Sequence, residues 1–323
     1  MKTLKLLTVA MLGAALSAPA LAAGYPEKPL TVIVPFPPGG ASDTTARLVA
    51  PKLSEALGQP AVVENRPGAN GSIGAAQVAQ AKPDGYTLLV ASIGVYGINP
   101  VLYKTLKYDP QKNFDLLTVA VRTPNVLVAT PNFPANSVAE LIAHLKKNPE
   151  KVTFASSGAG SSDHLTAALF WQKTGTTGLH VPYKGGGPAI TDLIGGHADV
   201  SFQNLGAVAG HIKAGKLKLL AVTSDKRVST FPDAPTMAEA GVQGVEVYSW
   251  QAVAAPAGLP GDVKAKLESG LTGALAAPEV KGRFEEAGFE VVGTGSATFA
   301  EFLGAELARW KAVVETGKIT PDQ

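Results

Sequence analysis

The chain alternates short apolar runs with helical periods, and glycine-rich turns separate the two. The run Leu30–Val34 predicts a buried strand, and it is followed by Gly39-Gly40 and by a helical period over about 43–57. Further runs predict strands or extended segments at 61–64, 87–92, 125–130, 152–157, 180–183, 200–202, 217–223 and 245–255, and helical periods lie at 71–81, 137–147, 163–173, 189–194 and 298–316. This alternation predicts an α/β fold in which mixed sheets are flanked by helices.

The segment 137–147 carries the clearest helix signal. Ser137 and Glu140 have the spacing of a capping box, and Asn148-Pro149 stops the helix. The apolar residues that follow the cap recur at i, i+3, i+4 and i+7, which predicts one buried face.

Two strand–helix series of similar length predict two lobes. No flexible Gly/Ser linker separates them, so we expect two crossover segments that act as a hinge. The first lobe is expected over residues 24–124 plus 246–323, and the second over 125–245.

The N-terminus has the pattern of a cleaved signal peptide over residues 1–22. Lys2 and Lys5 precede a short apolar stretch, and Ala20-Leu21-Ala22 is a small-x-small cleavage site. We therefore expect an exported, periplasmic protein.

Charge and cysteine content exclude several partner and site classes. The 28 basic residues include Lys2 and Lys5, and 26 residues are acidic, so the mature chain is close to neutral and nucleic acid is not expected as a partner. Cysteine is absent, which excludes disulfides, thiolate metal sites and a cysteine nucleophile. The five histidines show no metal-ligand spacing, and neither a metal nor a cofactor is expected.

Three glycine-rich turns each lie between a strand and a helix, at 35–43, 156–162 and 183–187. Ligands of open α/β sheets collect beyond the carboxyl ends of the strands, and a helix start presents free N–H groups that favour an anion. Any one of these turns is also what an ordinary strand–helix connection requires, but three turns at one crevice favour binding. The candidate binding residues are Phe36, Gly39, Gly40, Ala41, Ser42, Asp43, Ser92, Tyr96, Ser157, Gly158, Gly160, Ser161, His164, Tyr183, Gly185 and Asn204.

Several candidates have a structural alternative. Asp43 is expected to cap its helix rather than to bind the ligand, and His164 is expected to make a structural hydrogen bond. Phe36 is equally consistent with core packing and with a ligand wall. Ser92 ends a strand and can donate to a ligand, and Asn204 follows a strand and is a candidate polar contact.

No catalytic template fits the chain, and no catalytic residue is assigned. Gly158–Ser162 is not a nucleophile elbow, which requires a serine between alternating glycines. An exported hydrolase that uses Ser161 and His164 remains an alternative, as does a periplasmic sensor subunit.

The chain resembles the substrate-binding receptors of tripartite tricarboxylate transporters, the Bug-type receptors, over nearly its whole mature length. The matching residues include Val34-Pro35-Phe36 with Gly39-Gly40, Val63–Ala69, Pro83–Leu88, Ser157–Ser161 with His164, and Val181–Gly186. The resemblance implies a two-lobe periplasmic binding protein (type II-like) that closes around a small carboxylate. It also implies a monomer that delivers this ligand to a membrane permease.

One segment departs from the family pattern. The family usually carries hydroxyl residues and a histidine before Ile98-Asn99-Pro100, and here Gly94-Val95-Tyr96 stand there. Tyr96 therefore predicts an aromatic or less polar monocarboxylate rather than a tricarboxylate such as citrate.

Overall fold

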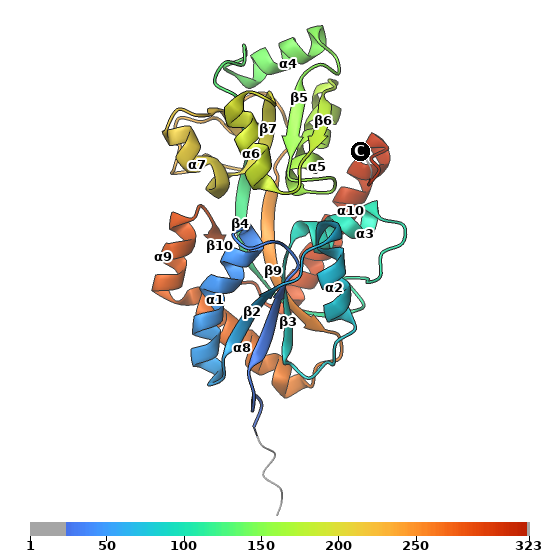
Figure 1. Ribbon diagram of the computed structural model, residues 1–323, viewed down its shortest axis with the longest axis vertical. Helices are drawn as coiled ribbons and strands as arrows, with labels where there is room; N and C mark the ends of the chain where they lie inside the picture. Colours follow the sequence, from blue (N-terminus) through green and yellow to red (C-terminus); the bar gives the residue numbers. More distant parts are fainter. Residues whose placement is uncertain (1–23, 322–323) are drawn as a thin grey trace, which may run out of the picture.

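The computed structural model describes residues 24–321, and the predicted signal peptide lies outside them. Two bodies lie one above the other and are joined by the long strands β4 (Phe114–Ala129) and β9 (Tyr248–Pro256) (Figure 1). Strand β4 pairs with β9 in its first part and with strands of the upper body in its last part. The connection is therefore made by strands that belong to the sheets themselves.

The lower body is built on a mixed sheet. Strand β1 (Leu30–Val34) pairs in parallel with β2 (Ala61–Asn65) and β3 (Thr87–Ser92), and β9 runs antiparallel between β3 and β4. Its other elements include α1 (Ala41–Leu57), the short 3-10 helix η1 (Ala69–Gly71), α2 (Ser72–Ala79), the π-helix η2 (Gly94–Ile98), α3 (Asn99–Leu102), α8 (Gly261–Ala276), α9 (Pro278–Glu286) and β10 (Glu290–Val291). Because β1, β2 and β3 are parallel, their carboxyl ends lie at the same edge of the sheet.

The upper body repeats this plan on a smaller scale. Strand β5 (Thr153–Ser156) pairs in parallel with β6 (Leu179–Pro182) and β7 (Val200–Asn204). Its other elements are α4 (Val138–Lys147), α5 (Ser162–Thr174), α6 (Gly186–Gly195), α7 (Leu205–Lys213) and β8 (Lys218–Val222). Residues 157–161 and 183–185 thus follow the ends of neighbouring parallel strands.

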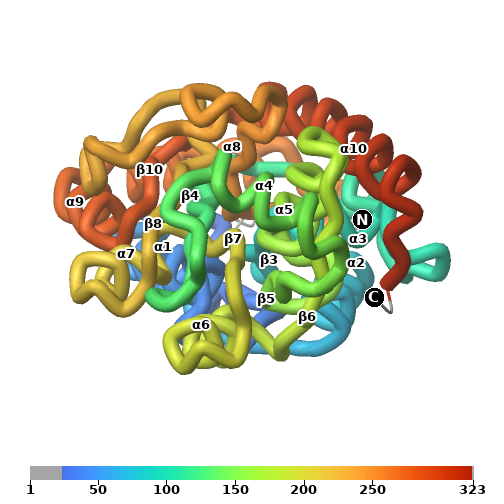
Figure 2. Tube along the Cα trace, turned by 90° about the horizontal axis from the view of Figure 1, so that it is seen from above, coloured from blue at the N-terminus to red at the C-terminus, as the bar shows by residue number. Residues whose placement is uncertain are grey.

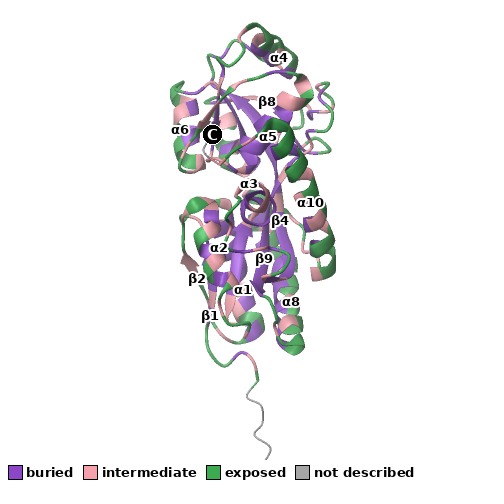
Figure 3. Cartoon of the chain, turned by 90° about the vertical axis from the view of Figure 1, so that its right-hand side faces the viewer, coloured by how far each residue is buried: buried purple, intermediate pink, exposed green. Residues whose placement is uncertain are grey.

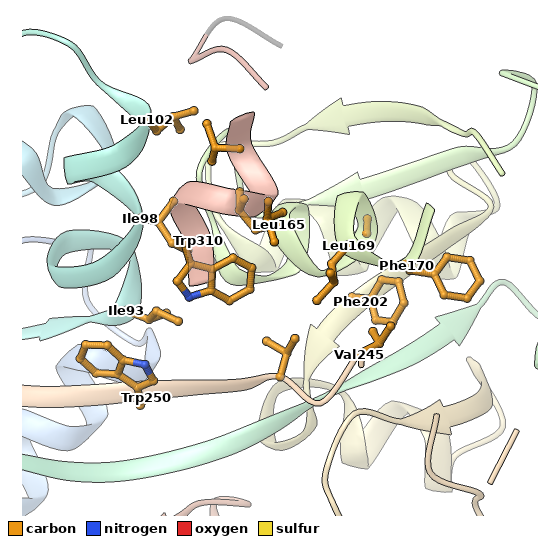
Figure 4. Packing of buried hydrophobic residues seen from close by; sticks show 14 of the residues in the cluster. Ile93, Ile98, Leu102, Leu165, Leu169, Phe170, Phe202, Val245, Trp250 and Trp310 are labelled. Atoms are coloured by element: carbon orange, nitrogen blue, oxygen red, sulfur yellow. The ribbon is translucent and has the colours of Figure 1, made fainter. Parts of the chain in front are cut away.

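Helix α10 (Ser296–Gly317) ties the two bodies together along one side of the molecule, the side on which α8 also lies (Figure 2). Its Trp310 lies between Ile98 of the lower body and Leu165 of the upper body (Figure 4). These side chains belong to one continuous hydrophobic cluster, so the bodies share a core on this side.

Burial follows the strands. The residues of β4 and β9 are mostly buried, whereas exposed residues lie on the outer faces of α4, α8 and α10 (Figure 3). Among residues 24–321 no helix has the length and apolar character needed to cross a membrane.

The predicted α/β class is confirmed, but several elements differ from the prediction. The strand expected at 125–130 is the end of a 16-residue strand that starts at Phe114. The sequence did not predict helices α3, α7, α8 and α9, the π-helix η2 or strand β10. At α4, Ser137 Oγ accepts from the Glu140 N–H as expected, but the Glu140 carboxylate accepts from the N–H of Asn136 rather than that of Ser137.

Candidate functional site

The first glycine turn is held in place by Asp43 in the first turn of α1. One carboxylate oxygen of Asp43 accepts from the Gly39 N–H at 2.9 Å and from Arg47 Nε at 2.9 Å, and the other accepts from Asn65 Nδ2 at 2.9 Å. Burial raises the pKa of Asp43, but the hydrogen bonds from Arg47, Gly39 and Asn65 outweigh it and hold this pKa below its usual value. Asp43 therefore shapes the turn before α1, and it does not cap the helix as the sequence predicted, because its main-chain partner is Gly39, which precedes the N-cap Gly40.

The start of α1 leaves main-chain donors available. The N-cap residue is Gly40, and no side chain accepts a capping hydrogen bond from the first turn of α1. The first N–H groups of a helix also have no intrahelical partner, so those of α1 remain available. Gly39 adopts φ +87°, a conformation that glycine tolerates best. Ser42 is buried and donates to Gln251 Oε1 at 2.6 Å, so its hydroxyl points into the lower body.

Ser92 and Phe36 lie beside this turn. Ser92 is half-buried and pairs in the sheet with Gln251, the partner of Ser42. Phe36 is partly buried, and its ring lies against Gly71, where an added Cβ would come within 3.0 Å of Phe36 Cζ. These two residues line the end of the lower sheet.

The second turn, between β5 and α5, is also held by an aspartate in the first turn of the helix that follows it. The Asp163 carboxylate accepts from the Ser157 N–H and from Ser157 Oγ, each at 2.7 Å, and from Gln203 Nε2 at 3.2 Å. Asp163 is buried, and burial raises its pKa. In each body an aspartate in the first helical turn reaches back to fix the loop before it.

The serine hydroxyls of this turn are used within it. Ser161 Oγ donates to the Gly158 carbonyl at 2.6 Å, and the Ser157 hydroxyl donates to Asp163. The hydroxyl protons of Ser157 and Ser161 are therefore both engaged within the turn, and contacts of these residues with a ligand stay predictions. At the start of α5 the Ser162 N–H has no intrahelical partner, whereas the Asp163 N–H lies against the carboxylate of its own residue.

His164 is a structural residue, as expected. Its Nδ1 accepts from the Gly160 N–H at 3.1 Å, and its ring stacks on His180 with centroids 3.7 Å apart. Burial, and next the nearby His180, lower the pKa of His164 to about 3. The ring nitrogen that faces the turn is engaged by a main-chain amide, so Ser161 and His164 do not form a nucleophile–base pair.

The third turn lies against the second. An added Cβ on Gly186 would meet Ser157 Oγ at 3.3 Å and Gln203 Oε1 at 3.5 Å, and the Gly185 N–H donates to the Ser157 carbonyl at 3.1 Å. Tyr183 donates to Asp192 at 2.7 Å, which directs its hydroxyl to α6 rather than to the turn. Burial and then Asp192 raise the pKa of Tyr183 to about 12.

Two further candidates, Tyr96 and Asn204, have their side chains engaged within the protein. The prediction that Tyr96 contacts the ligand is wrong: the π-helix turns its side chain into the core, where it is fully buried and stacks on Trp250 with centroids 5.9 Å apart. Asn204 donates to Asn125 Oδ1 at 2.6 Å and thereby fixes the end of β7 to the adjacent strand β4.

The two bodies touch at two further places near these turns. Asn70 Nδ2 donates to the Gly160 carbonyl at 3.1 Å, which links the loop before α2 to the second turn. At the start of α7, Gly206 packs against Ala287 and Gly288. Sequence reasoning missed Asn65, Asn70, Gln203 and Gln251, because their partners lie far away along the chain.

A separate cavity of about 570 Å³ lies at the opposite end of the upper body. It is lined by Thr130, Asn132, Phe133, Pro134, His144, Asn148, Lys151, Val152, Gly195, Gly196 and Asp199. Its walls include the residues that precede β5, whereas the glycine turn follows β5, so this cavity is distinct from the candidate site.

The sequence model of the tripartite tricarboxylate transporter family receptor matches residues 45–319. The chain belongs to this receptor family. It is 40% identical to protein BugT of Bordetella pertussis over 314 residues, which is 94% of each chain.

Solved structures of receptors agree with this assignment. The chain is similar to Rpa4515 of R. palustris with adipate, at a TM-score of 0.86 and 37% identity over 92% of this chain and 99% of that one. It is also similar to MatC of Rhodopseudomonas palustris with bound malate, at a TM-score of 0.83 and 32% identity over 90% of this chain and 100% of that one. The two-lobe fold and the receptor family are thereby confirmed.

Proposed function

We propose that this receptor captures a small carboxylate between its two lobes in the periplasm and delivers it to a tripartite-type membrane permease. The observation that carries the proposal is the matched pair of turns: Asp43 fixes one at the start of α1, and Asp163 fixes the other at the start of α5. Both helix starts present main-chain N–H groups, which suit an anion.

The chemistry of the candidate residues supports a carboxylate ligand. None of them is a lysine or arginine, and Arg47, which reaches the first turn, is paired with Asp43 at 2.9 Å. A carboxylate would thus be held by neutral donors, which bind it without an opposing charge. Adipate in one relative and malate in another support a linear acid.

Closure of the lobes is the mechanism that we propose. The lobes comprise residues 24–124 plus 246–323 and residues 125–245, with the hinge in β4 and before β9. A ligand that contacts both turns makes more hydrogen bonds in the closed arrangement, so binding shifts the population towards closure. We propose a binding role without catalysis, and the engagement of His164 Nδ1 by Gly160 supports it.

A thermal-shift screen of the mature protein tests this proposal. Mono-, di- and tricarboxylic acids are compared with their neutral methyl esters. A cognate acid at a hundredfold excess over its Kd adds about 2.7 kcal/mol to the free energy of unfolding, and its ester adds none. Equal stabilisation by acid and ester, hydrolysis of the ester, or no stabilising acid would overturn the proposal.

A further inference from the structure

Asn70 lies in the glycine-rich loop Gly68–Gly71, which no part of the proposed function has used so far. Its backbone is left-handed, with φ 49° and ψ 41°, and the preceding Ala69 has φ 46°. Side chains rarely adopt this conformation, although asparagine tolerates it better than most. The loop thus holds Asn70 in a particular orientation.

Hydrogen bonds within its own lobe fix the Asn70 side chain. Its Nδ2 donates to Asn99 Oδ1 at 3.0 Å, and Asn99 Nδ2 returns hydrogen bonds to the Asn70 carbonyl at 2.9 Å and to Ser72 Oγ at 3.0 Å. Asn99 is fully buried. This reciprocal arrangement leaves the second Nδ2 proton aimed outwards.

That proton reaches the other lobe. Asn70 Nδ2 donates to the Gly160 carbonyl at 3.1 Å, while the Gly160 N–H is engaged by His164 Nδ1 at 3.1 Å. Gly160 is buried with φ +76°, and an added Cβ would lie 2.8 Å from Leu102 Cδ2. Gly160 is therefore fixed from its own lobe through its N–H and from the first lobe through its carbonyl.

We propose that Asn70 is a positioning residue for ligand binding, which sets the start of α5 at a defined place relative to the start of α1. This inference rests on the proposed function. Gly160 directly precedes Ser161, the N-cap of α5, so a shift of the Gly160 peptide moves the amides of Ser162 and Asp163. A ligand held by both helix starts loses affinity when this link is absent.

The test uses Asn70→Gly, which removes the side-chain amide and retains the left-handed backbone. Asn70→Asp is a second variant, which keeps the side-chain shape and replaces the donor by an acceptor. Ala69→Gly is the matched control, because it changes a neighbouring left-handed residue and leaves the link to Gly160 intact. All variants are made in the full mature chain.

Two readouts are compared across these proteins. In the unliganded protein, both Asn70 variants should raise amide hydrogen exchange in residues 157–165 at least tenfold over Ala69→Gly. Adipate, malate, citrate and benzoate are then titrated separately by calorimetry. The acid that binds the unsubstituted protein should bind the Asn70 variants about tenfold more weakly and Ala69→Gly within twofold.

The outcomes separate the two claims. Unchanged hydrogen exchange, or unchanged affinity for an acid that binds the unsubstituted protein, overturns the positioning role and leaves the proposed function standing. If none of the four acids binds the unsubstituted protein, the proposed function fails and the positioning role fails with it.

Discussion

Gly206 at the start of α7 packs directly against Gly288, which lies between α9 and β10. The two Cα atoms are so close that a Cβ added to Gly288 would lie 2.7 Å from the Cα of Gly206, and a Cβ added to Gly206 would lie 2.1 Å from the Ala287 carbonyl oxygen. The contact is next to the connecting strand β4, because Thr123 donates to the Gly288 carbonyl at 2.8 Å. Two glycines thus allow the lobes to meet backbone to backbone beside the hinge.

Gly206→Ala is expected to destabilise the protein by about 1–3 kcal/mol. The new methyl group overlaps main-chain atoms, which cannot move aside by changing a side-chain rotamer. Gly210→Ala is the matched control in the same helix, since nothing lies within 4 Å of its added Cβ. The control should gain up to about 1 kcal/mol from the better helix propensity of alanine. Urea unfolding measures both variants, and equal stability of the two would show that the glycine contact does not constrain the lobes.

Glu306 is expected to be a major source of stability where α10 crosses the lower body. Its Oε2 accepts from the indole N–H of Trp250 at 2.9 Å and from that of Trp310 at 3.1 Å. Glu306→Ala leaves two buried donors without an acceptor and should cost about 2–4 kcal/mol, whereas Glu306→Gln keeps an acceptor oxygen and should cost less.

Denaturation of these variants, followed by circular dichroism and tryptophan fluorescence, checks this expectation. Glu301→Ala, at an exposed position of the same helix, serves as the control. The expectation would be contradicted if Glu306→Ala lowered the free energy of unfolding no more than Glu301→Ala does.

Stability should fall in mild acid because His164 is buried in its neutral form. Its pKa is lowered from 6.5 to about 3, so below about pH 6.5 the unfolded chain binds a proton that the folded protein does not. The contribution of neutral His164 is thus present above pH 6.5 and is lost progressively as the pH falls towards 3. Between pH 7 and pH 5 the loss from this group is about 2 kcal/mol.

His164→Gln removes this titration, so its free energy of unfolding should fall less between pH 7 and pH 5 than that of the unsubstituted protein. Urea unfolding at both pH values gives the difference. An identical pH dependence in the two proteins would show that His164 does not titrate in this way.

Tyr96 should matter for stability and not for ligand choice. Its ring packs against Trp250, Phe114 and Phe299, and its hydroxyl makes only long hydrogen bonds, of 3.4 Å to Leu89 O and 3.5 Å to Ala252 O. Tyr96→Ala should cost about 3–5 kcal/mol, and Tyr96→Phe about 1 kcal/mol or less. Calorimetric titration of Tyr96→Phe should return the affinity of the unsubstituted protein within twofold, and a tenfold change would restore Tyr96 as a ligand contact.

Local sequence patterns were sufficient to predict most strands and helices. Leu30–Val34 and Thr87–Ser92 are apolar runs that form buried strands, and Ser137 caps a helix through contacts within four residues. The long strand β4 was predicted only from Asn125 onwards, because the part before it, Phe114–Pro124, pairs irregularly with β9, which lies more than a hundred residues later in the chain.

The candidate site shows the same limit. The glycine turns are visible in the sequence, since the residues of each are adjacent. The residues that hold these turns in place are not visible in the sequence, because their partners are distant along the chain. Asn70 donates to Gly160, 90 positions away, and Ser42 donates to Gln251, 209 positions away. Tyr96 was assigned wrongly because its side-chain direction depends on a π-helix, which the sequence pattern did not reveal.

A crystal structure of the mature protein with the acid selected by the thermal-shift screen tests the central claim most directly. We predict that one ligand carboxylate accepts hydrogen bonds from main-chain N–H groups of Gly40–Ser42 and of Ser162 or Asp163, in the same complex. A ligand that contacts only one of these two helix starts would contradict the account, and so would a ligand in the distal cavity beside His144 and Lys151.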